Sequence, residues 1–325
     1  MKCAKTTGKI SCCCSLQQSD ALPHNTKFDE EENFLVLRES PVDEQDSQQQ
    51  KQASDEGSGL EIDESELLST EFPQKPLSER KSECGQTPIK PEDTRRIVGG
   101  PVSKECHLRC GGSLIDPEWI LSAGHCVDGY SLFPELFRVK LGVYDYRSEN
   151  EIGQITAKLK AIHIHPKFGS PKLFSHDLSL IKIAGGPINI TDHIQPVCLL
   201  RNASRLMEGG KSAYVTGWGA TSEDGAVSSK LRQVRVPFLD TEQCQKVYHK
   251  ELDDSMVCAG KAGVDSCQGD SGGPLVARAE DKRWYQLGVV SWGLGCAQEG
   301  YAGVYSKVSN MCDFVEKTTG KKMCK

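Results

Sequence analysis

The stretch 265–274, which reads DSCQGDSGGP, places Ser271 between a carboxylate and two glycines. A serine hydroxyl is a weak nucleophile until a neighbouring base takes its proton. Attack on a carbonyl group also needs donors aimed at the oxygen that becomes negative in the transition state. Glycine lets backbone N–H groups point there, because a residue without Cβ adopts conformations that others cannot. A Gly-rich surface turn would explain GDSG alone but not ten positions in this order, so we interpret Ser271 as a nucleophile.

A base and a carboxylate that could serve this serine stand earlier in the chain. His125 lies beside a cysteine in LSAGHC (121–126), and Asp177 enters the apolar run of SHDLSLI (175–181). The adjacent His176 is a less suitable partner, because successive side chains of an extended strand point to opposite faces. His163 and His165 are better explained as surface or strand residues than as metal ligands.

The order His, Asp, Ser along the chain is that of the chymotrypsin type and differs from the subtilisin and α/β-hydrolase orders. Four further motifs accompany it: RIVGG (96–100), CGGSLI (110–115), TGWG (216–219) and VSWG (290–293). With them the sequence resembles a trypsin-like serine protease of the chymotrypsin family, from about Cys84 to about Val315. The resemblance implies a secreted endopeptidase made as a zymogen.

The resemblance also implies the catalytic roles. Ser271 would be the nucleophile, His125 the general base and then acid, and Asp177 the buried carboxylate that orients the imidazole. Backbone N–H groups of Gly269 and Ser271 would form the oxyanion hole.

The primary specificity pocket is implied by Asp265, six residues before Ser271. A carboxylate there would pair with a cationic P1 side chain, so we expect cleavage after Arg or Lys. The other implied substrate-binding residues are Ser266, Ser291, Trp292, Gly293, Gly303 and Phe174. The two glycines would leave the pocket open to a long side chain, and the two aromatic residues would wall the S2–S4 region.

Activation is expected by cleavage between Arg96 and Ile97, by a trypsin-like protease that acts as a partner. The new α-ammonium of Ile97 would pair with the Asp270 carboxylate, because a buried charge needs such a partner. The pair should order the oxyanion loop. The uncleaved precursor is therefore expected to be nearly inactive.

The chain has 15 cysteines, which is typical of an oxidising compartment. The resemblance implies the disulfides Cys84–Cys198, Cys110–Cys126, Cys244–Cys258 and Cys267–Cys296. The first would tie the pro-segment to the catalytic part. Seven cysteines remain whose pairing cannot be read from sequence: Cys3, Cys12, Cys13, Cys14, Cys106, Cys312 and Cys324.

We expect no metal and no cofactor. Three adjacent cysteines, Cys12–Cys14, lack the usual spacing of zinc ligands. Val143 replaces the first glutamate ligand of the calcium loop of trypsins, which leaves too few oxygen ligands for a 6–8-coordinate ion.

The net charge of −6 is unevenly distributed. Residues 29–83 carry 17 acidic and 5 basic residues, the composition of a disordered tether, whereas residues 97–325 carry 25 acidic and 27 basic residues. This near-neutral part does not favour nucleic-acid binding, and no run of about 18 apolar residues indicates a membrane span. We divide the chain into a Cys-rich N-terminal stub (1–27), an acidic disordered linker (28–83), an activation-peptide region (84–96) and a peptidase domain (97–325).

Secretion to the extracellular space is indicated by the cysteines and by glycosylation sequons at Asn189 and Asn202. Residues 1–20 lack the apolar core of a signal peptide, but the disulfide pattern outweighs this. The expected partners are protein or peptide substrates with Arg or Lys at P1, and serpin or Kunitz-type inhibitors.

Short β-type runs recur after Ile97, at 112–115, 119–122, 137–142, 155–164, 179–183, 212–217, 230–236, 273–276, 284–291 and 303–308. Many short strands separated by turns predict an all-β barrel or sandwich. The resemblance specifies two six-stranded antiparallel β-barrels with the active site between them. Helices are expected at 241–249 and, at the C-terminus, 310–318.

One departure from the family concerns Ile97 and Cys110, which are only 13 positions apart. Thirteen residues span about 43–47 Å when extended, so the new N-terminus could still reach its pocket. The first barrel would nevertheless lose a strand or build it from fewer residues. The alternative interpretation is therefore a catalytically weak or inactive homologue that acts as a binding protein. An adhesive protein built on the Cys-rich stub explains almost none of the motifs.

Overall fold

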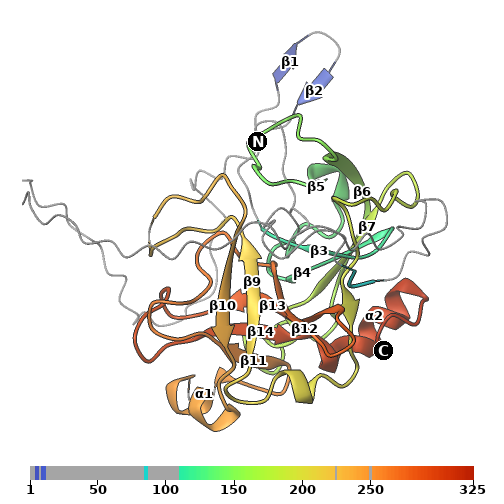
Figure 1. The fold of residues 1–325 in the computed structure, drawn as a ribbon. Helices are drawn as coiled ribbons and strands as arrows, with labels where there is room; N and C mark the ends of the chain where they lie inside the picture. Colours follow the sequence, from blue (N-terminus) through green and yellow to red (C-terminus); the bar gives the residue numbers. More distant parts are fainter. Residues whose placement is uncertain (1–3, 7–8, 12–83, 87–109, 224, 249–250) are drawn as a thin grey trace, which may run out of the picture. The chain divides into compact units, whose positions relative to one another are not determined.

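The structure, a computed structural model, describes residues 4–6, 9–11, 84–86, 110–223, 225–248 and 251–325 (Figure 1). By its contacts the chain separates into two units, Met1–Ser78 and Glu79–Lys325. In the first unit the strands β1 (Ala4–Thr6) and β2 (Lys9–Ser11) form an antiparallel hairpin. The predicted acidic linker, Arg96 and Ile97 lie outside the described residues.

The first sheet of the second unit has five strands in the order β3-β4-β7-β6-β5. Their bounds are β3 Ser113–Asp116, β4 Trp119–Ser122, β5 Arg138–Leu141, β6 Ile155–Ile164 and β7 Ser179–Ile183. All neighbouring pairs are antiparallel. β5 alternates buried and half-buried positions, as expected of a strand with one face on a core.

The second sheet has seven strands, six of them in the order β10-β9-β12-β13-β14-β11. Their bounds are β9 Ser212–Gly217, β10 Arg232–Pro237, β11 Met256–Ala259, β12 Pro274–Arg278, β13 Trp284–Trp292 and β14 Gly303–Lys307. The seventh strand, β8 (Cys198–Leu199), pairs with β13 in parallel.

Each sheet curls around its own hydrophobic core, and the predicted two-part β architecture is confirmed. The first core includes Leu114, Ile120 and Leu180, and the second includes Val215, Leu275 and Tyr305. The count of six strands in each barrel differs, however, because the described sheets have five and seven. β8 adds a strand to the second sheet, and residues 97–109, where the shortened strand of the first barrel was expected, lie outside the described residues.

Helices are few, as the β-rich pattern predicts. The helix α1 (Thr241–Tyr248) packs near β11, and the turn η6 (Val308–Met311) leads into α2 (Cys312–Thr319). Short 3-10 turns also occur at η3 (Pro134–Leu136) and η4 (Ser204–Leu206). None of the described helices is long and apolar enough to cross a membrane.

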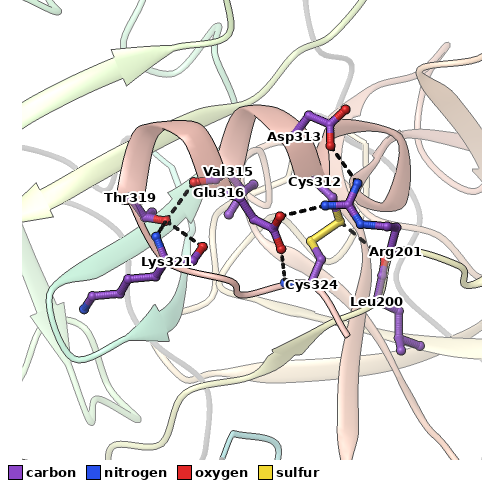
Figure 2. Close-up of polar contacts among 9 residues, drawn as sticks. All are labelled: Leu200, Arg201, Cys312, Asp313, Val315, Glu316, Thr319, Lys321 and Cys324. Atoms are coloured by element: carbon purple, nitrogen blue, oxygen red, sulfur yellow. Dashed lines mark hydrogen bonds and ion pairs between the residues drawn. A yellow bond between two sulfur atoms is a disulfide. The ribbon is translucent and has the colours of Figure 1, made fainter.

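The helix α2 is fixed to the first core and to the end of β8. Val315 is buried in that core, and Gly320 ends the helix in the left-handed conformation that favours glycine. Figure 2 shows the guanidinium of Arg201 between two carboxylates of the helix. It lies 2.6 Å from Asp313 and 2.7 Å from Glu316. A disulfide joins Cys312, the first residue of the helix, to Cys324 in the segment that follows the helix. The sequence left this pair open.

Candidate active site

His125 and Asp177 meet because of how β4 and β7 are paired. These strands are antiparallel neighbours with Ser122 opposite Ser179, so the residues after β4 and before β7 lie at the same end of the sheet. The His125 Nδ1 atom is 2.7 Å from Asp177 Oδ2, and the backbone N–H of His125 donates to Asp177 Oδ1 over 2.8 Å. Nδ1 is therefore assigned as the protonated nitrogen, which leaves Nε2 as the acceptor.

The Asp177 carboxylate is fully enclosed, and its side chain is 0% exposed. Ser291 Oγ donates to its Oδ2 over 2.5 Å, and Ser306 Oγ donates to its backbone carbonyl over 2.6 Å. Buried charges are stable only when such donors surround them. The carboxylate therefore holds the imidazole in one orientation.

Ser271 lies in the turn that leads into β12, and this turn contacts the first sheet. The backbone N–H of Gly111, just before β3, donates to the Ser271 carbonyl over 2.7 Å. A Cβ on Gly272 would collide with Ser122 Oγ and lie 3.2 Å from Cys126 Sγ, next to His125. Glycine is required here because it allows this approach, and its φ of +77° favours glycine as well.

The structure brings Ser271 close to His125 without joining their side chains. Among the described residues no hydrogen bond links Ser271 Oγ to His125 Nε2, and Nε2 lies 3.7 Å from Cys126 Sγ. Catalytic hydrogen bonds of this kind commonly tighten only when substrate binds.

The oxyanion positions Gly269 and Ser271 flank Asp270. Within the described part of the chain, neither of their backbone N–H groups donates to a carbonyl group. Gly269 has φ +96°, and a Cβ there would lie 3.2 Å from Gly219 Cα. Glycine thus lets the loop turn tightly against β9's end.

Asp265, six residues before Ser271 in the chain, is partly buried. Its Oδ1 accepts from the Ser266 N–H over 2.8 Å, and its Oδ2 from the Ala297 N–H over 3.3 Å. Burial nevertheless raises the pKa of Asp265 above its ordinary value, with these backbone hydrogen bonds acting in the opposite direction. A Cβ on Gly303 would lie 2.6 Å from Asp265 Oδ1, whereas one on Gly293 would have nothing closer than 3.8 Å.

The polar lining of the pocket continues from Asp265. Ser266 Oγ lies 3.1 Å from the hydroxyl of Tyr305. Tyr305 is fully buried, and burial followed by the charge of Asp265 raises the pKa of its hydroxyl, which stays protonated. The pocket therefore holds a neutral hydrogen-bond donor, the Tyr305 hydroxyl, close to the Asp265 carboxylate.

Aromatic side chains line another flank of His125. The Phe174 ring is perpendicular to the imidazole at 6.1 Å, and it stacks on Trp292 at 6.0 Å. Tyr248 packs edge-on against Trp292 at 4.9 Å. The predicted S2–S4 residues are thus gathered into one apolar wall.

Asp270 lines a cavity of about 230 Å³, and Asp265 lines the same cavity. Asp270 Oδ1 accepts from the Gly219 N–H over 2.8 Å and Asp270 Oδ2 from the Cys267 N–H over 3.0 Å. Burial, the largest influence, raises the pKa of Asp270 above its ordinary value despite these two bonds. A Cβ on Gly217 or Gly219 would collide with the carboxylate, so both positions require glycine.

The four disulfides implied by the resemblance are present: Cys84–Cys198, Cys110–Cys126, Cys244–Cys258 and Cys267–Cys296. The fifth, Cys312–Cys324, carried no signal beyond two cysteines 12 positions apart. Cys3, Cys12, Cys13, Cys14 and Cys106 lie outside the described residues. Asn189 and Asn202, the sequon residues, are both exposed.

Three other histidines, His163, His165 and His176, have contacts outside the site. His176 adopts φ +53° and stacks on His165 at 4.7 Å, while His163 packs on Trp119. Burial, and then the charges of His176 and Lys167, lowers the pKa of His165 to about 4.

Two places among the described residues resemble metal sites. Cys110, His125 and Cys126 lie within 4.8 Å of one another, but the two cysteines are joined as a disulfide and offer no thiolate. In the loop that corresponds to the trypsin calcium loop, Lys140 Nζ contacts the Tyr146 carbonyl at 2.9 Å and the Ser148 carbonyl at 3.1 Å. The side chain of Glu151 accepts two backbone N–H groups of the same loop. An ammonium group thus occupies the position of a cation there.

Comparison with known proteins agrees with this arrangement. The sequence profile of the Trypsin family matches residues 84–315. Serine proteinase stubble of Drosophila melanogaster is 35% identical over 268 residues, which are 74% of this chain and 33% of that protein. Ovochymase of Halocynthia roretzi is 34% identical over 258 residues, 73% of this chain and 16% of that protein.

A shorter relative covers the same region. Trypsin II-P29 of Gallus gallus is 37% identical over 240 residues, 70% of this chain and 90% of that protein. The chain spans a third or less of the two longer relatives and most of the shorter one.

Proposed function

Because this chain belongs to the trypsin family of serine proteases, we propose that it is an endopeptidase that cleaves after Arg or Lys and is activated after Arg96. Family membership gives the reaction class but not the substrate. The observation that carries the choice of substrate is the partly buried Asp265 carboxylate, next to Ser266 and the Tyr305 hydroxyl. A cationic P1 side chain that reaches the Asp265 carboxylate would offset the unfavourable effect of burial on its negative charge.

The proposed reaction follows from the contacts of three side chains. Ser271 Oγ attacks the carbonyl carbon of the substrate while His125 Nε2 takes its proton. Asp177 stabilises the imidazolium, because its carboxylate already holds Nδ1–H and is enclosed by donors. The imidazolium then gives its proton to the leaving amine, and water repeats the sequence on the acyl-enzyme.

The oxyanion of each tetrahedral intermediate would bind the N–H groups of Gly269 and Ser271. These groups have no carbonyl partner among the described residues, which supports the assignment. The Phe174–Trp292 wall would bind residues before the scissile bond and favours a small or apolar P2.

Activation would depend on Asp270 and its cavity. The carboxylate is buried with two backbone donors and, among the described residues, no cation within ion-pair distance. The α-ammonium of a newly formed Ile97 terminus supplies that cation. We further propose an extracellular protein glycosylated at Asn189 and Asn202, with serpin or Kunitz-type inhibitors as partners.

The function is tested by titrating the processed protein with a fluorophosphonate that acylates active serines. Stoichiometric labelling at Ser271, with hydrolysis of an Arg amide substrate, is the expected result. Correctly processed protein, with Ile97 verified as its N-terminus, that is not labelled would favour the alternative of an inactive binding homologue.

The disulfide Cys84–Cys198 predicts how the processed protein migrates in electrophoresis with and without reductant. Cleavage after Arg96 should leave two chains that migrate as one band without reductant and as two bands with it. The Cys198→Ser variant should release the short chain even without reductant. Retention of the short chain by that variant would contradict a covalent link through this pair.

The raised pKa of Asp270 predicts how the stability of the precursor depends on pH. Its pKa in the folded precursor lies above the ordinary value of 3.8, so ionisation opposes folding. Stability is therefore highest below that value and declines as pH rises through the higher folded-state pKa. Relative to Asp270, the Asp270→Asn variant should gain stability progressively as pH rises above about 4, until the pH has passed the raised folded-state pKa of Asp270.

Urea unfolding of the two precursors, both carrying Ser271→Ala to prevent self-cleavage, measures this difference. The processed forms are the matched control, because there the ammonium of Ile97 should make Asp270→Asn destabilising. A difference between the precursors that does not change with pH would disprove the assignment.

A further inference from the structure

The backbone just before Asp177 has an unfavourable conformation. His176 has φ +53°, in the left-handed region that residues other than glycine rarely adopt. The backbone N–H of Leu178 donates to the His176 carbonyl over 2.8 Å, which closes a tight turn around Asp177. Such conformations cost free energy and persist only where the surrounding structure imposes them. Contacts from outside this turn are therefore needed to place Asp177, whose carboxylate orients His125.

Two serines of the second sheet supply such contacts. Ser255 Oγ, just before β11, accepts the His176 N–H over 2.9 Å, and Ser306 Oγ in β14 donates to the Asp177 carbonyl over 2.6 Å. The strands β11 and β14 are antiparallel neighbours with Met256 opposite Ser306, so the two serines come from adjacent strands. The second sheet thus contacts the backbone on both sides of the His176–Asp177 peptide.

The hydroxyl of Ser255 can accept from His176 because its own hydrogen is directed to Asp253. A hydroxyl group has one hydrogen to donate and two lone pairs that accept. Ser255 Oγ donates to Asp253 Oδ1 over 2.5 Å, and the Ser255 N–H donates to the same oxygen over 2.8 Å. The carboxylate therefore fixes the Ser255 hydroxyl with its oxygen as the acceptor for the His176 N–H.

The second oxygen of Asp253 orients another serine in the same way. Ser175 Oγ donates to Asp253 Oδ2 and accepts the Lys172 N–H over 2.8 Å. Ser175 is fully buried and directly precedes His176 in the chain. One carboxylate thus joins the segment that leads into β11 to the segment that carries Asp177.

Asp253 keeps its negative charge at the pH values of an activity assay. Burial alone would raise its pKa, but hydrogen bonds from Ser175 and Ser255, together with the charge of His176, hold the pKa below the ordinary value of 3.8. The other ionisable groups packed here are His165, whose ring stacks on that of His176 at 4.7 Å, and Lys167, whose charge acts on His165. An ionised carboxylate accepts hydrogen bonds and donates none, so both serine hydroxyls point their hydrogens to it.

We propose that Asp253 is a positioning residue for the Asp177 carboxylate. It acts through Ser255 and the His176 N–H, and not by contact with the reacting atoms. Without the Asp253 carboxylate, the Ser255 hydroxyl could rotate, the constraint on His176 would weaken, and Asp177 could shift relative to the imidazole. A shift of about 1 Å at a catalytic group can lower a rate about 100-fold. This inference rests on the proposed endopeptidase function.

The test measures how fast a neutral fluorophosphonate labels Ser271 in the processed, full protein from about pH 5 to about pH 9. The reagent has no cationic P1 group, so the charge of Asp265 does not enter the rate. The rate falls at acid pH because a protonated imidazole cannot act as a base. The Asp177 carboxylate favours the protonated imidazole, so a displaced Asp177 should move this acid limb to lower pH and reduce the plateau rate.

Asp253→Ala should lower the plateau rate about tenfold and move the acid limb about 1 pH unit lower, since one unit corresponds to a tenfold change in equilibrium. Ser255→Ala should have a similar effect. The double variant Asp253→Ala/Ser255→Ala should show no larger effect, because the two residues act in series. Asp253→Asn keeps one oxygen that can accept from Ser255, so it should retain most of the rate.

Two control variants separate positioning from a general loss of structure. Asp254→Ala removes the neighbouring exposed carboxylate and should keep the natural profile. Val315→Ala truncates a fully buried side chain of the first core. It should lower the melting temperature without moving the acid limb.

Three results would overturn the positioning role. These are an unchanged acid limb in Asp253→Ala, an equal loss in Asp253→Asn and Asp253→Ala, and additive losses in the double variant. If Asp253→Ala does not fold, an unchanged acid limb in Ser255→Ala overturns it. The failure of the proposed function is distinguishable, because then the processed natural protein, with Ile97 verified as its N-terminus, would not be labelled at all.

Discussion

Replacing Asp265 by serine is expected to lower kcat/KM for Arg substrates by about 10²- to 10⁴-fold. Removing one partner of a buried ion pair costs about 3–5 kcal/mol, because the other charge is left without compensation. Here the uncompensated charge is the P1 guanidinium, and the polar groups around position 265 that would remain, among them Ser266, Tyr305 and backbone N–H groups, carry no negative charge. The backbone donors that now serve the carboxylate would add a further mismatch, since they repel a cation.

Steady-state kinetics on a series of amides with Arg, Lys, Phe or Leu at P1 measures the effect. The exposed Asp254 offers the matched control, and Asp254→Ser should leave all four rates nearly unchanged. If the natural protein cleaves equally well after Phe and after Arg, Asp265 does not determine the substrate.

The Arg96→Gln variant is expected to be secreted, to carry an intact Ser271 and to have almost no amidase activity. Without cleavage no α-ammonium reaches Asp270, and the loop that holds Gly269 and Ser271 lacks the interaction that would set it. A trypsin-like activator should produce a large increase in the rate for the natural precursor and none for the variant. The rates before and after treatment, with N-terminal sequencing of the products, measure this switch.

The Arg95→Gln variant is the control, since it alters the neighbouring basic residue and leaves the cleaved bond as Arg96–Ile97. It should be activated like the natural protein. Equal activity of the natural precursor and the processed form would show that Asp270 does not control the oxyanion loop. The short distance from Ile97 to Cys110 makes this test informative, because the terminus has only 13 residues with which to reach the cavity.

Much of the site could be predicted because its residues stand in local motifs. The contact between His125 and Asp177 depends on two short runs, LSAGHC and SHDLSLI, that lie next to paired strands. Likewise, the strand pattern located β4, β6, β7 and β9 with the bounds found in the structure.

What could not be predicted depends on contacts between distant parts of the chain. The Cys312–Cys324 pair forms because the end of the chain runs back beside β8, where Leu199 pairs with Cys324. No local sequence pattern indicates that the end of the chain runs back beside β8. β8 itself is only two residues long and pairs in parallel, so hydrophobic alternation could not reveal it.

The contacts of Lys140 have a practical consequence for a protein of this family. A cation attached to the chain by a side chain cannot dissociate on dilution or be removed by a chelator. The melting temperature should therefore be the same in EDTA as in millimolar calcium, whereas Lys140→Met should lower it by about 3–6 °C in both buffers. The loop's resistance to unfolding and to proteolytic cleavage would therefore depend on the Lys140 side chain and not on calcium in the medium.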